Sequence, residues 1–483
     1  MENSNQHSLS KYAAVCAVVA AAYFIWRLIP VLSNTVISII MAALLLLGGG
    51  YLIKCRRKNT LTDETILKVI IFSGFVMRIG YMLYTPCDER SHDLWQFDPE
   101  SGGHAGYILC LAQNHSLPQT NHIQYYQQPF FYICASIISI VINAPLGTFR
   151  DSYWLVDAAK TLSCACSCMT LLLAERLCEM FSLSGKTKNR AMTVVAFLPA
   201  FYLSCRVTPD MLVCFMMTLA LIYTLRWHKN PSWKNTITLA VIYGLGVLTK
   251  ISMGVLALFT AVFMLEKLIS SKKTKRLKET AAKLTVFGCI SLPLGLWYSI
   301  RNMVRFRQFP TSVPNLGDSS PLYTGDHSIF QRFVIPDFAS LFESPYIDLY
   351  SDYSLPIYAL KTSLFGEFTY SVYPIIPITL LFAALFLAVL CAAGMFACFK
   401  KGGDKRLMIL GGACWLFWLS LAAFYYDYPH TCSMDFRYMT FLPAPCAILM
   451  ARFLEGKNKT LTKFTDIGLT LFAGCSCLMY CLV

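Results

Sequence analysis

Long apolar runs, separated by short polar segments, recur along the whole chain. A bilayer core of about 30 Å needs roughly 20 apolar residues per helix, and thirteen runs come close to that length. We predict membrane-spanning helices at about residues 12–29, 35–53, 66–84, 154–180, 190–206, 211–228, 235–249, 253–270, 284–301, 373–399, 407–426, 438–453 and 464–483. The runs are continuous, whereas a membrane β-barrel would show alternating segments of about 10 residues. The fold class is therefore an all-α polytopic membrane protein.

Basic residues follow every second apolar run. Clusters of Lys and Arg start at Lys54, Lys186, Lys229, Lys272, Lys400 and Lys457. Cytoplasmic loops collect Lys and Arg, so these clusters predict a cytoplasmic N-terminus and an external C-terminus.

A shorter apolar run at 129–145 has proline at both ends. If it crossed the bilayer, every later basic loop would lie outside. We therefore predict an interfacial helix on the outer side, with a second short helix beginning near residue 108.

This topology leaves two long outer segments, 85–153 and 302–372, and outer loops of that length are usually functional. The expected organisation is two extra N-terminal helices in 1–60, a seven-helix module in 61–301, the large outer loop 302–372 and a four-helix region in 373–483.

The composition agrees with a membrane protein. Of the 483 residues, 56% are apolar and only 14% are charged, against about 25% charged in soluble domains. The net charge of +14 would suggest nucleic acid as a partner in a soluble protein. Here the cytoplasmic loops account for it, so we expect the lipid bilayer and no nucleic acid as a partner.

Acidic residues are scarce in this chain but cluster in the first outer loop. The loop contains Asp88, Glu89, Asp93, Asp98 and Glu100. A carboxylate beside the membrane can accept a proton from a hydroxyl nucleophile or hold a divalent cation. Asp98 and Glu100 suit a capping role at the following helix, whereas Asp93 follows His92, which could orient it or share its proton. Asp88 is the second candidate.

Several cations lie on the predicted outer side, against the positive-inside trend. They are Lys250, Arg301, Lys361 and Arg437. Each alone could be a snorkelling residue, and Arg437 could pair with Asp435. Together they indicate a bound anion such as a phosphate at headgroup depth.

Short motifs in this order and on this side of the membrane resemble the GT-C superfamily of membrane glycosyltransferases. The similarity is to the glycosyltransferase family 39-like branch, which is related to protein O-mannosyltransferases and aminoarabinose transferases. The motifs are His92-Asp93, GHAGYI at 103–108, YYQQP at 125–129, Asp210, GLGVLTK at 244–250, GLWYSIRN at 295–302, KTSLFGE at 361–367 and DFRY at 435–438. Two departures stand out: Gly103-His104 replaces the Asp-Glu pair of many members, and one proline of Tyr-x-Pro-Pro is lost. The first departure assigns the acidic role to Asp93.

The resemblance implies a GT-C fold and inverting transfer of a sugar from a polyprenyl-phosphate-linked donor to a hydroxyl of a glycan, lipid or protein. The active site would face outward from a bacterial plasma membrane, or into the ER lumen of a eukaryote. The implied catalytic residues are Asp93, Asp88, His92 and Asp210. The implied substrate-binding residues are His104, Tyr107, Tyr126, Lys250, Arg301, Lys361, Glu367, Arg437 and Tyr438.

Some alternatives stay open. A divalent cation (Mg²⁺ or Mn²⁺) would have Asp93 and Asp210 as ligands. A transporter or flippase of lipid-linked sugars would place ionisable residues in mid-membrane, and few occur here. A non-catalytic scaffold would need neither the acids nor the outer cations.

Overall fold

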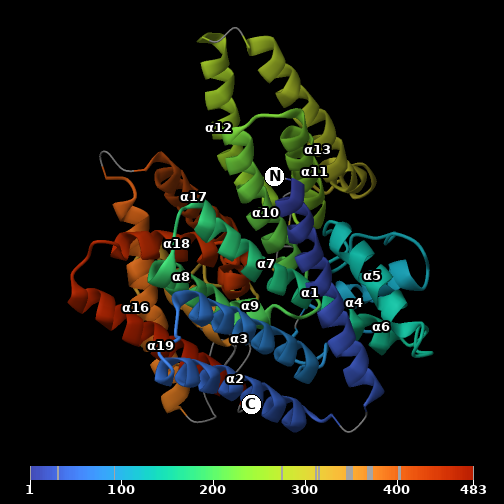
Figure 1. Ribbon diagram of the computed structural model, residues 1–483. Coiled ribbons are helices and arrows are strands. Elements are labelled where there is room, and N and C mark those ends of the chain that lie inside the picture. The colour runs from blue at the N-terminus through green and yellow to red at the C-terminus, as the bar shows by residue number, and fades with distance from the viewer. Residues whose placement is uncertain are drawn as a thin grey trace. The chain divides into compact units, whose positions relative to one another are not determined.

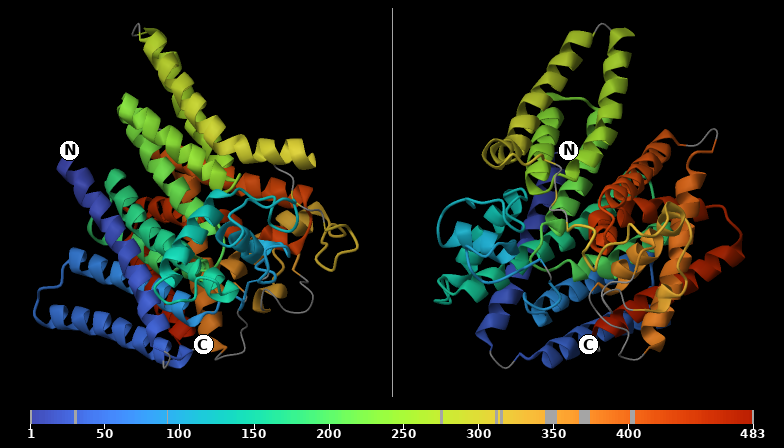
Figure 2. Two further views of the ribbon diagram at one scale, coloured as in Figure 1. Left: turned by 90° about the vertical axis from the view of Figure 1, so that its right-hand side faces the viewer. Right: turned by 180° about the vertical axis from the view of Figure 1, so that it is seen from behind.

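The computed structural model describes residues 2–29, 32–91, 93–273, 276–310, 313, 316–343, 352–366, 374–400 and 404–481 (Figures 1 and 2). Within these ranges the protein is helical and has no β-strand, with one isolated bridge between Tyr323 and His430. The α-helices are α1 (Glu2–Leu28), α2 (Asn34–Arg57), α3 (Asp63–Tyr84), α4 (Gly103–Ala112), α5 (Phe130–Asn143), α6 (Ser152–Ala158), α7 (Lys160–Met180), α8 (Gly185–Phe197), α9 (Pro199–Leu203), α10 (Asp210–Lys229), α11 (Trp233–Thr249), α12 (Met253–Lys273), α13 (Leu277–Phe306), α14 (Ile329–Phe333), α15 (Leu355–Phe365), α16 (Ile375–Ala397), α17 (Lys405–Asp427), α18 (Pro443–Leu454) and α19 (Lys459–Cys481). Short 3₁₀ helices are η1 (Ser340–Phe342), η3 (Thr431–Met434) and η4 (Phe436–Met439).

Ten helical segments among the described residues are long and apolar enough to cross a membrane. They coincide with ten of the thirteen predicted runs, which confirms an integral, multi-pass, all-α membrane protein. The predicted runs at 190–206, 235–249 and 438–453 do not form helices of that length, so the count of thirteen is not supported.

Proline and helix length explain the three differences. Pro199 keeps Leu198 extended at ψ 118°, so one predicted helix becomes α8 and α9. Pro443 starts α18, which has 12 residues and is about 18 Å long. The 17 residues of α11 reach about 26 Å, which is shorter than a bilayer core.

The chain divides into two compact units that are interleaved along the sequence. The first contains Met1–Arg90, Ser167–Cys205 and Asn315–Val483, and the second contains Ser91–Cys166 and Arg206–Pro314. In the first unit α3 packs against α2 and α8, and α16 packs against α18 and α19. In the second, α11 packs against α10 and α13, and α4, α5 and α6 pack together. The linear division at residues 60, 301 and 372 stays a prediction.

Arg78 stabilises the core of the first unit at the break between α8 and α9. Its side chain is fully buried. The guanidinium donates to the carbonyls of Val195 and Ala196, each at 2.9 Å, and to Ser167 Oγ at 2.9 Å. Because the helix breaks before Pro199, these carbonyls need other donors, and Arg78 supplies them.

Two helices form within residues 85–153, the segment predicted to be the first outer loop and to contain interfacial helices. α5 follows Pro129 and is 14 residues long, or about 21 Å, so it is too short to span. α4 has 10 residues. The helix at 130–143 is therefore as expected, α4 begins five residues earlier than predicted, and the location of both at the membrane interface stays a prediction.

Candidate active site

The turn at Asp93 is fastened to the start of α4 within the second unit. The backbone N–H of His104 donates to the Asp93 carbonyl at 3.0 Å, and that of Ala105 donates to the Leu94 carbonyl at 3.1 Å. Gly103 permits this approach because it has φ +73° and because a Cβ there would collide with the Leu94 carbonyl. Two residues singled out by sequence, Asp93 and His104, thus come from adjoining backbone segments.

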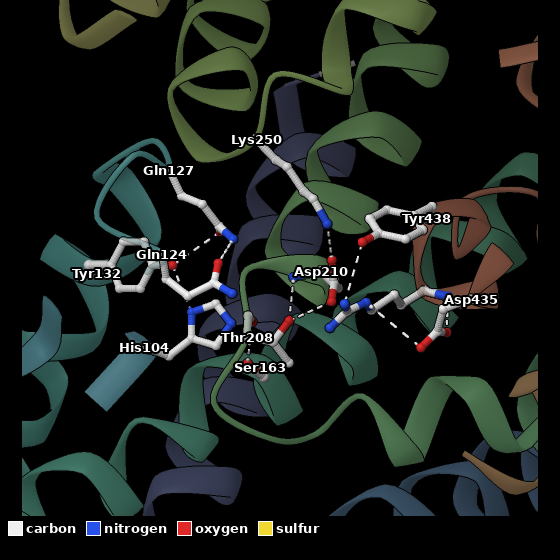
Figure 3. A network of polar contacts seen from close by, with 11 residues as sticks. His104, Gln124, Gln127, Tyr132, Ser163, Thr208, Asp210, Lys250, Asp435 and Tyr438 are labelled. Carbon is white, nitrogen blue, oxygen red and sulfur yellow. Dashed lines mark hydrogen bonds and ion pairs between the residues drawn. The ribbon is translucent and has the colours of Figure 1, made fainter. Parts of the chain in front are cut away.

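His104 belongs to a buried polar and aromatic cluster (Figure 3). Its Nδ1 lies 2.7 Å from the Tyr132 hydroxyl. Tyr132 donates to Gln127 Oε1 at 3.1 Å, and Gln127 Nε2 donates to Gln124 Oε1. Tyr107 stacks on Tyr132 with ring centroids 3.8 Å apart. The cluster holds the imidazole in one orientation.

Both acidic candidates of the second unit act electrostatically on Tyr132. Burial is the main cause of the raised pKa of this phenol, and repulsion from neighbours that include Tyr126, Asp93 and Asp210 adds to it. Burial likewise raises the pKa of Tyr107. Both hydroxyls therefore stay protonated at neutral pH, and Asp93 and Asp210 lie within electrostatic range of one phenol.

Asp210 begins α10 and is almost completely buried (Figure 3). Its Oδ1 is paired with Lys250 Nζ, at the C-terminal end of α11. Thr208 Oγ1 donates to Asp210 Oδ2 at 2.5 Å, and Ser163 Oγ donates to the Thr208 carbonyl at 3.1 Å. A cation, a hydroxyl and the positive end of the α10 dipole therefore surround this carboxylate.

Arg301 and Tyr126 lie where α13 meets the segment 85–153. Arg301 donates to the Pro118 carbonyl at 2.5 Å and to Asn302 Oδ1 at 2.9 Å. Its guanidinium also lies 5.1 Å from the centre of the Tyr298 ring. Asn302 Nδ2 donates to the Tyr126 carbonyl at 3.4 Å. Arg301 thus tethers the loop to α13.

The remaining described candidates belong to the first unit. Asp88 is exposed in a turn after α3. Lys361 is fully buried, 2.9 Å from each carboxylate oxygen of Asp352 and 2.7 Å from the Ser340 carbonyl. Its ammonium is therefore already neutralised by a carboxylate.

Arg437 and Tyr438 lie on η4, which precedes α18. Arg437 pairs with Asp435 at 3.7 Å, as the alternative interpretation of the sequence anticipated, and donates to the Tyr438 hydroxyl at 3.3 Å. The Arg437 side chain keeps 22% of its surface exposed.

His92 and Glu367 lie outside the described residues. The second unit brings together Asp93, His104, Tyr107, Tyr126, Asp210, Lys250 and Arg301. Among the described side chains, no group of three or more His, Cys, Asp or Glu residues is arranged to hold a metal. Lys250 and Thr208 bond the two carboxylate oxygens of Asp210, and the divalent cation left open above stays a prediction.

Sequence reasoning missed the residues that hold the candidates in place. Thr208 stands two positions before Asp210, a spacing at which a hydroxyl at a helix start can accept from a backbone N–H, as it does here from Asp210 N–H at 3.2 Å. Tyr132 stands three positions after the last residue of the YYQQP motif and could have been included with it. Asp352 gave no local signal, because its partner Lys361 is nine residues away across the start of α15.

Residues 157–297 match the family model described as dolichyl-phosphate-mannose-protein mannosyltransferase, and no curated protein matches the chain. Among solved structures, it is similar to the Archaeoglobus fulgidus oligosaccharyltransferase tethered with an acceptor peptide (11% identity, TM-score 0.45, 87% of this chain and 55% of that chain). The apo form of that protein gives 13% identity, a TM-score of 0.45, and coverage of 85% and 56%. The chain thus spans about half the length of these solved chains. The match over residues 157–297, which include Asp210 and Lys250, confirms the resemblance to GT-C superfamily membrane glycosyltransferases.

Proposed function

We propose that this protein is an inverting glycosyltransferase that moves a sugar from a polyprenyl-phosphate-linked donor to an acceptor hydroxyl on the outer face of the membrane. One observation carries the proposal. The segment that matches a dolichyl-phosphate-mannose-protein mannosyltransferase family contains the Asp210–Lys250 ion pair, and the same compact unit holds Asp93 and His104.

The chemistry makes two demands on the protein. The acceptor hydroxyl attacks the anomeric carbon and loses its proton, while the bond to the phosphate oxygen breaks and the lipid phosphate takes the electron pair. A carboxylate near the acceptor serves as general base. Fixed cations near the phosphate stabilise the charge that grows on the leaving group.

Asp93 is the proposed base. It is half-buried, and its turn is fixed to α4 by two backbone hydrogen bonds, so its position is defined before substrate arrives. Asp210 is less suited to accept a proton, because Lys250 and Thr208 already bond its carboxylate oxygens. It is a positioning residue that holds Lys250.

The proposed phosphate-binding cations of the second unit are Lys250 and Arg301, whose ammonium and guanidinium groups are fixed by neighbouring residues. Arg437 belongs to the first unit, and its role in phosphate binding stays a prediction from the sequence. Lys250 keeps 19% of its side chain exposed, so a ligand can approach it. The complete burial of Lys361 against Asp352 favours a structural role for that residue.

His104 is proposed to orient the acceptor. Tyr132 donates its only hydroxyl proton in the hydrogen bond to Gln127 Oε1, so its oxygen accepts a hydrogen bond from the Nδ1–H of His104 across 2.7 Å. This arrangement places the proton of a neutral imidazole on Nδ1 and makes Nε2 the acceptor atom. An imidazole of that tautomer can hold a sugar or protein hydroxyl.

The test is an assay of purified protein in nanodiscs with a panel of polyprenyl-phosphate sugars and acceptor mixtures. We expect release of polyprenyl phosphate together with a glycosylated product whose anomeric configuration is opposite to that of the donor, read by mass spectrometry and NMR. A nucleotide sugar serves as the control donor. Turnover of the nucleotide sugar alone would contradict the proposal, as would transbilayer movement of intact lipid-linked sugar without cleavage.

A further inference from the structure

The segment 329–342 of the large outer loop has its apolar side chains turned outward. Ile329, Phe330, Val334, Ile335, Phe338 and Phe342 are between 51% and 66% exposed. We call these six residues the apolar ridge. Six large apolar side chains exposed within 14 residues form a cluster that is unusual for a loop in water, where apolar residues are mostly buried.

The opposite side of the same segment carries a charge inward. Arg332 is only 5% exposed, donates to the Tyr425 carbonyl at 2.6 Å, and lies 4.4 Å from the centre of the Tyr425 ring. The Phe333 ring packs beside the same tyrosine at 5.2 Å. Arg332 and Phe333 lie on α14 (Ile329–Phe333), and Tyr425 lies in the last turn of α17. The segment therefore buries its charged residue, Arg332, and exposes its apolar residues. This distribution is expected of a segment that faces lipid.

A stripe of exposed apolar side chains runs along α16, one of the candidate membrane-spanning helices. Ile375, Phe382, Val389 and Phe396 recur every seven residues, and all are more than half exposed. Seven residues make about two turns of an α-helix, so side chains seven residues apart lie on the same face. These four side chains therefore form a single outward stripe on a candidate membrane-spanning helix.

Phe342, at the end of the ridge, touches this stripe. Its ring centre lies 6.1 Å from that of Phe382. Phe382 comes seven residues after Ile375, the first residue of α16, or roughly 10 Å along the helix axis. Amphipathic segments at a membrane surface bury their apolar side about 5–10 Å into the boundary between headgroups and acyl chains, which is the depth at which Phe342 meets α16.

We propose that the apolar ridge is a membrane-docking surface, with the acyl chains of the leaflet at the N-terminal end of α16 as its occupant. The Arg332–Tyr425 contact fixes the segment to α17 and turns the ridge toward lipid. The large outer loop is therefore held on the bilayer surface, and this holds whether or not the chain transfers sugars.

The experiment places the photo-crosslinking residue p-benzoyl-phenylalanine at Phe338 of the full-length protein in phosphatidylethanolamine–phosphatidylglycerol nanodiscs. Phe338 is 63% exposed, so the substitution leaves packed residues unchanged. The same residue at Phe382 is the positive control for contact with lipid. At Asp318, an exposed polar position of the same loop, it is the matched negative control.

After irradiation, intact-mass spectrometry is expected to show phospholipid adducts at Phe338 and Phe382, with at least a fivefold lower yield at Asp318. Adducts at Phe382 without adducts at Phe338 would overturn the proposal. So would a product of twice the protein mass from Phe338, because a second copy would then cover the ridge. An independent measurement places p-benzoyl-phenylalanine at Phe342, with and without the F330D/F338D substitutions. The yield of lipid adducts from position 342 should fall at least threefold in the substituted protein, and an unchanged yield would contradict docking through the ridge.

Discussion

Lys361 and Asp352 show at the residue scale how burial separates a structural cation from a ligand-binding one. The ammonium and the carboxylate are 0% and 5% exposed and lie 2.9 Å apart. Removing one member of such a pair leaves an uncompensated buried charge, whereas replacing both by apolar residues can be nearly neutral. Stability therefore distinguishes the two roles that the sequence leaves open for Lys361.

Lys361→Met is expected to lower the free energy of unfolding by about 3–5 kcal/mol, measured by denaturant titration in mixed micelles. The Lys361→Met/Asp352→Leu double variant should regain most of that loss and retain activity. If the single variant is as stable as the parent protein and only its KM for the lipid donor rises, Lys361 binds phosphate and the structural assignment is wrong.

Asp93→Asn tests the proposed general base. The amide keeps the shape of the side chain but cannot accept the proton, so we expect kcat to fall about 10²–10⁴-fold with little change in the thermal midpoint. Asp88→Asn is the matched control, because Asp88 is exposed in a turn of the other compact unit. Near-normal turnover by Asp93→Asn together with a large loss in Asp88→Asn would move the role to Asp88.

The Asp210–Lys250 pair predicts a non-additive double mutant. Asp210→Asn and Lys250→Gln should each lower kcat/KM about 10²-fold, because either change releases the ammonium from its fixed position. The double variant should be no more than a few-fold worse than either single one, since both act through one contact. Losses that multiply would show that the two side chains act independently.

Ion pairs between residues close together in the sequence could be predicted, whereas pairs between residues far apart in the sequence could not. The contact between Arg437 and Asp435 was foreseen as an alternative because the two residues are two positions apart. Asp210 and Lys250 were both identified, yet their contact was not, because 40 residues separate them. Helix packing decides which cation pairs with which acid, and a single sequence does not reveal how its helices pack.

At the scale of elements, hydropathy predicted where helices lie better than where they end. Ten predicted runs became helices long enough to span. The run at 190–206 failed because apolar content does not distinguish one helix from two that are separated by Pro199. The proline was visible, but its consequence depends on Arg78, whose guanidinium satisfies the carbonyls that the break exposes.

Gly103→Ala tests how α4 positions the proposed base. The glycine has φ +73°, and an added Cβ would collide with the Leu94 carbonyl, so the Asp93 turn must move away from α4. We expect a loss of stability of about 1–3 kcal/mol and a larger proportional loss of kcat than of donor binding. Gly147→Ala is the control: it also has positive φ, but its added Cβ meets nothing within 4 Å. Equal effects in the two variants would mean that backbone strain alone is responsible.

For the whole molecule, composition and hydropathy determine the class of protein, because only helices of this length and polarity satisfy their backbone groups inside a bilayer. The division into two compact units was not readable in the same way. Their segments alternate along the chain, and the boundary at residues 166 and 167 falls inside α7. No shift in composition marks a boundary within a continuous apolar helix.

The orientation of the molecule is the prediction on which the outward-facing active site depends. The basic clusters place residues 85–153 and 302–372 outside and 271–283 in the cytosol. Lys272→Cys, at an exposed position near the end of α12, and Asp318→Cys, at an exposed position of the outer loop, report on the two sides. In intact cells a membrane-impermeant maleimide should label the cysteine at position 318 at once, and the one at position 272 only after permeabilisation.

The unsubstituted protein measures the background from native cysteines, most of which lie in apolar helices. Labelling in the reverse order would place the proposed site in the cytosol, where the lipid-linked donor would have to be used before it crosses the membrane.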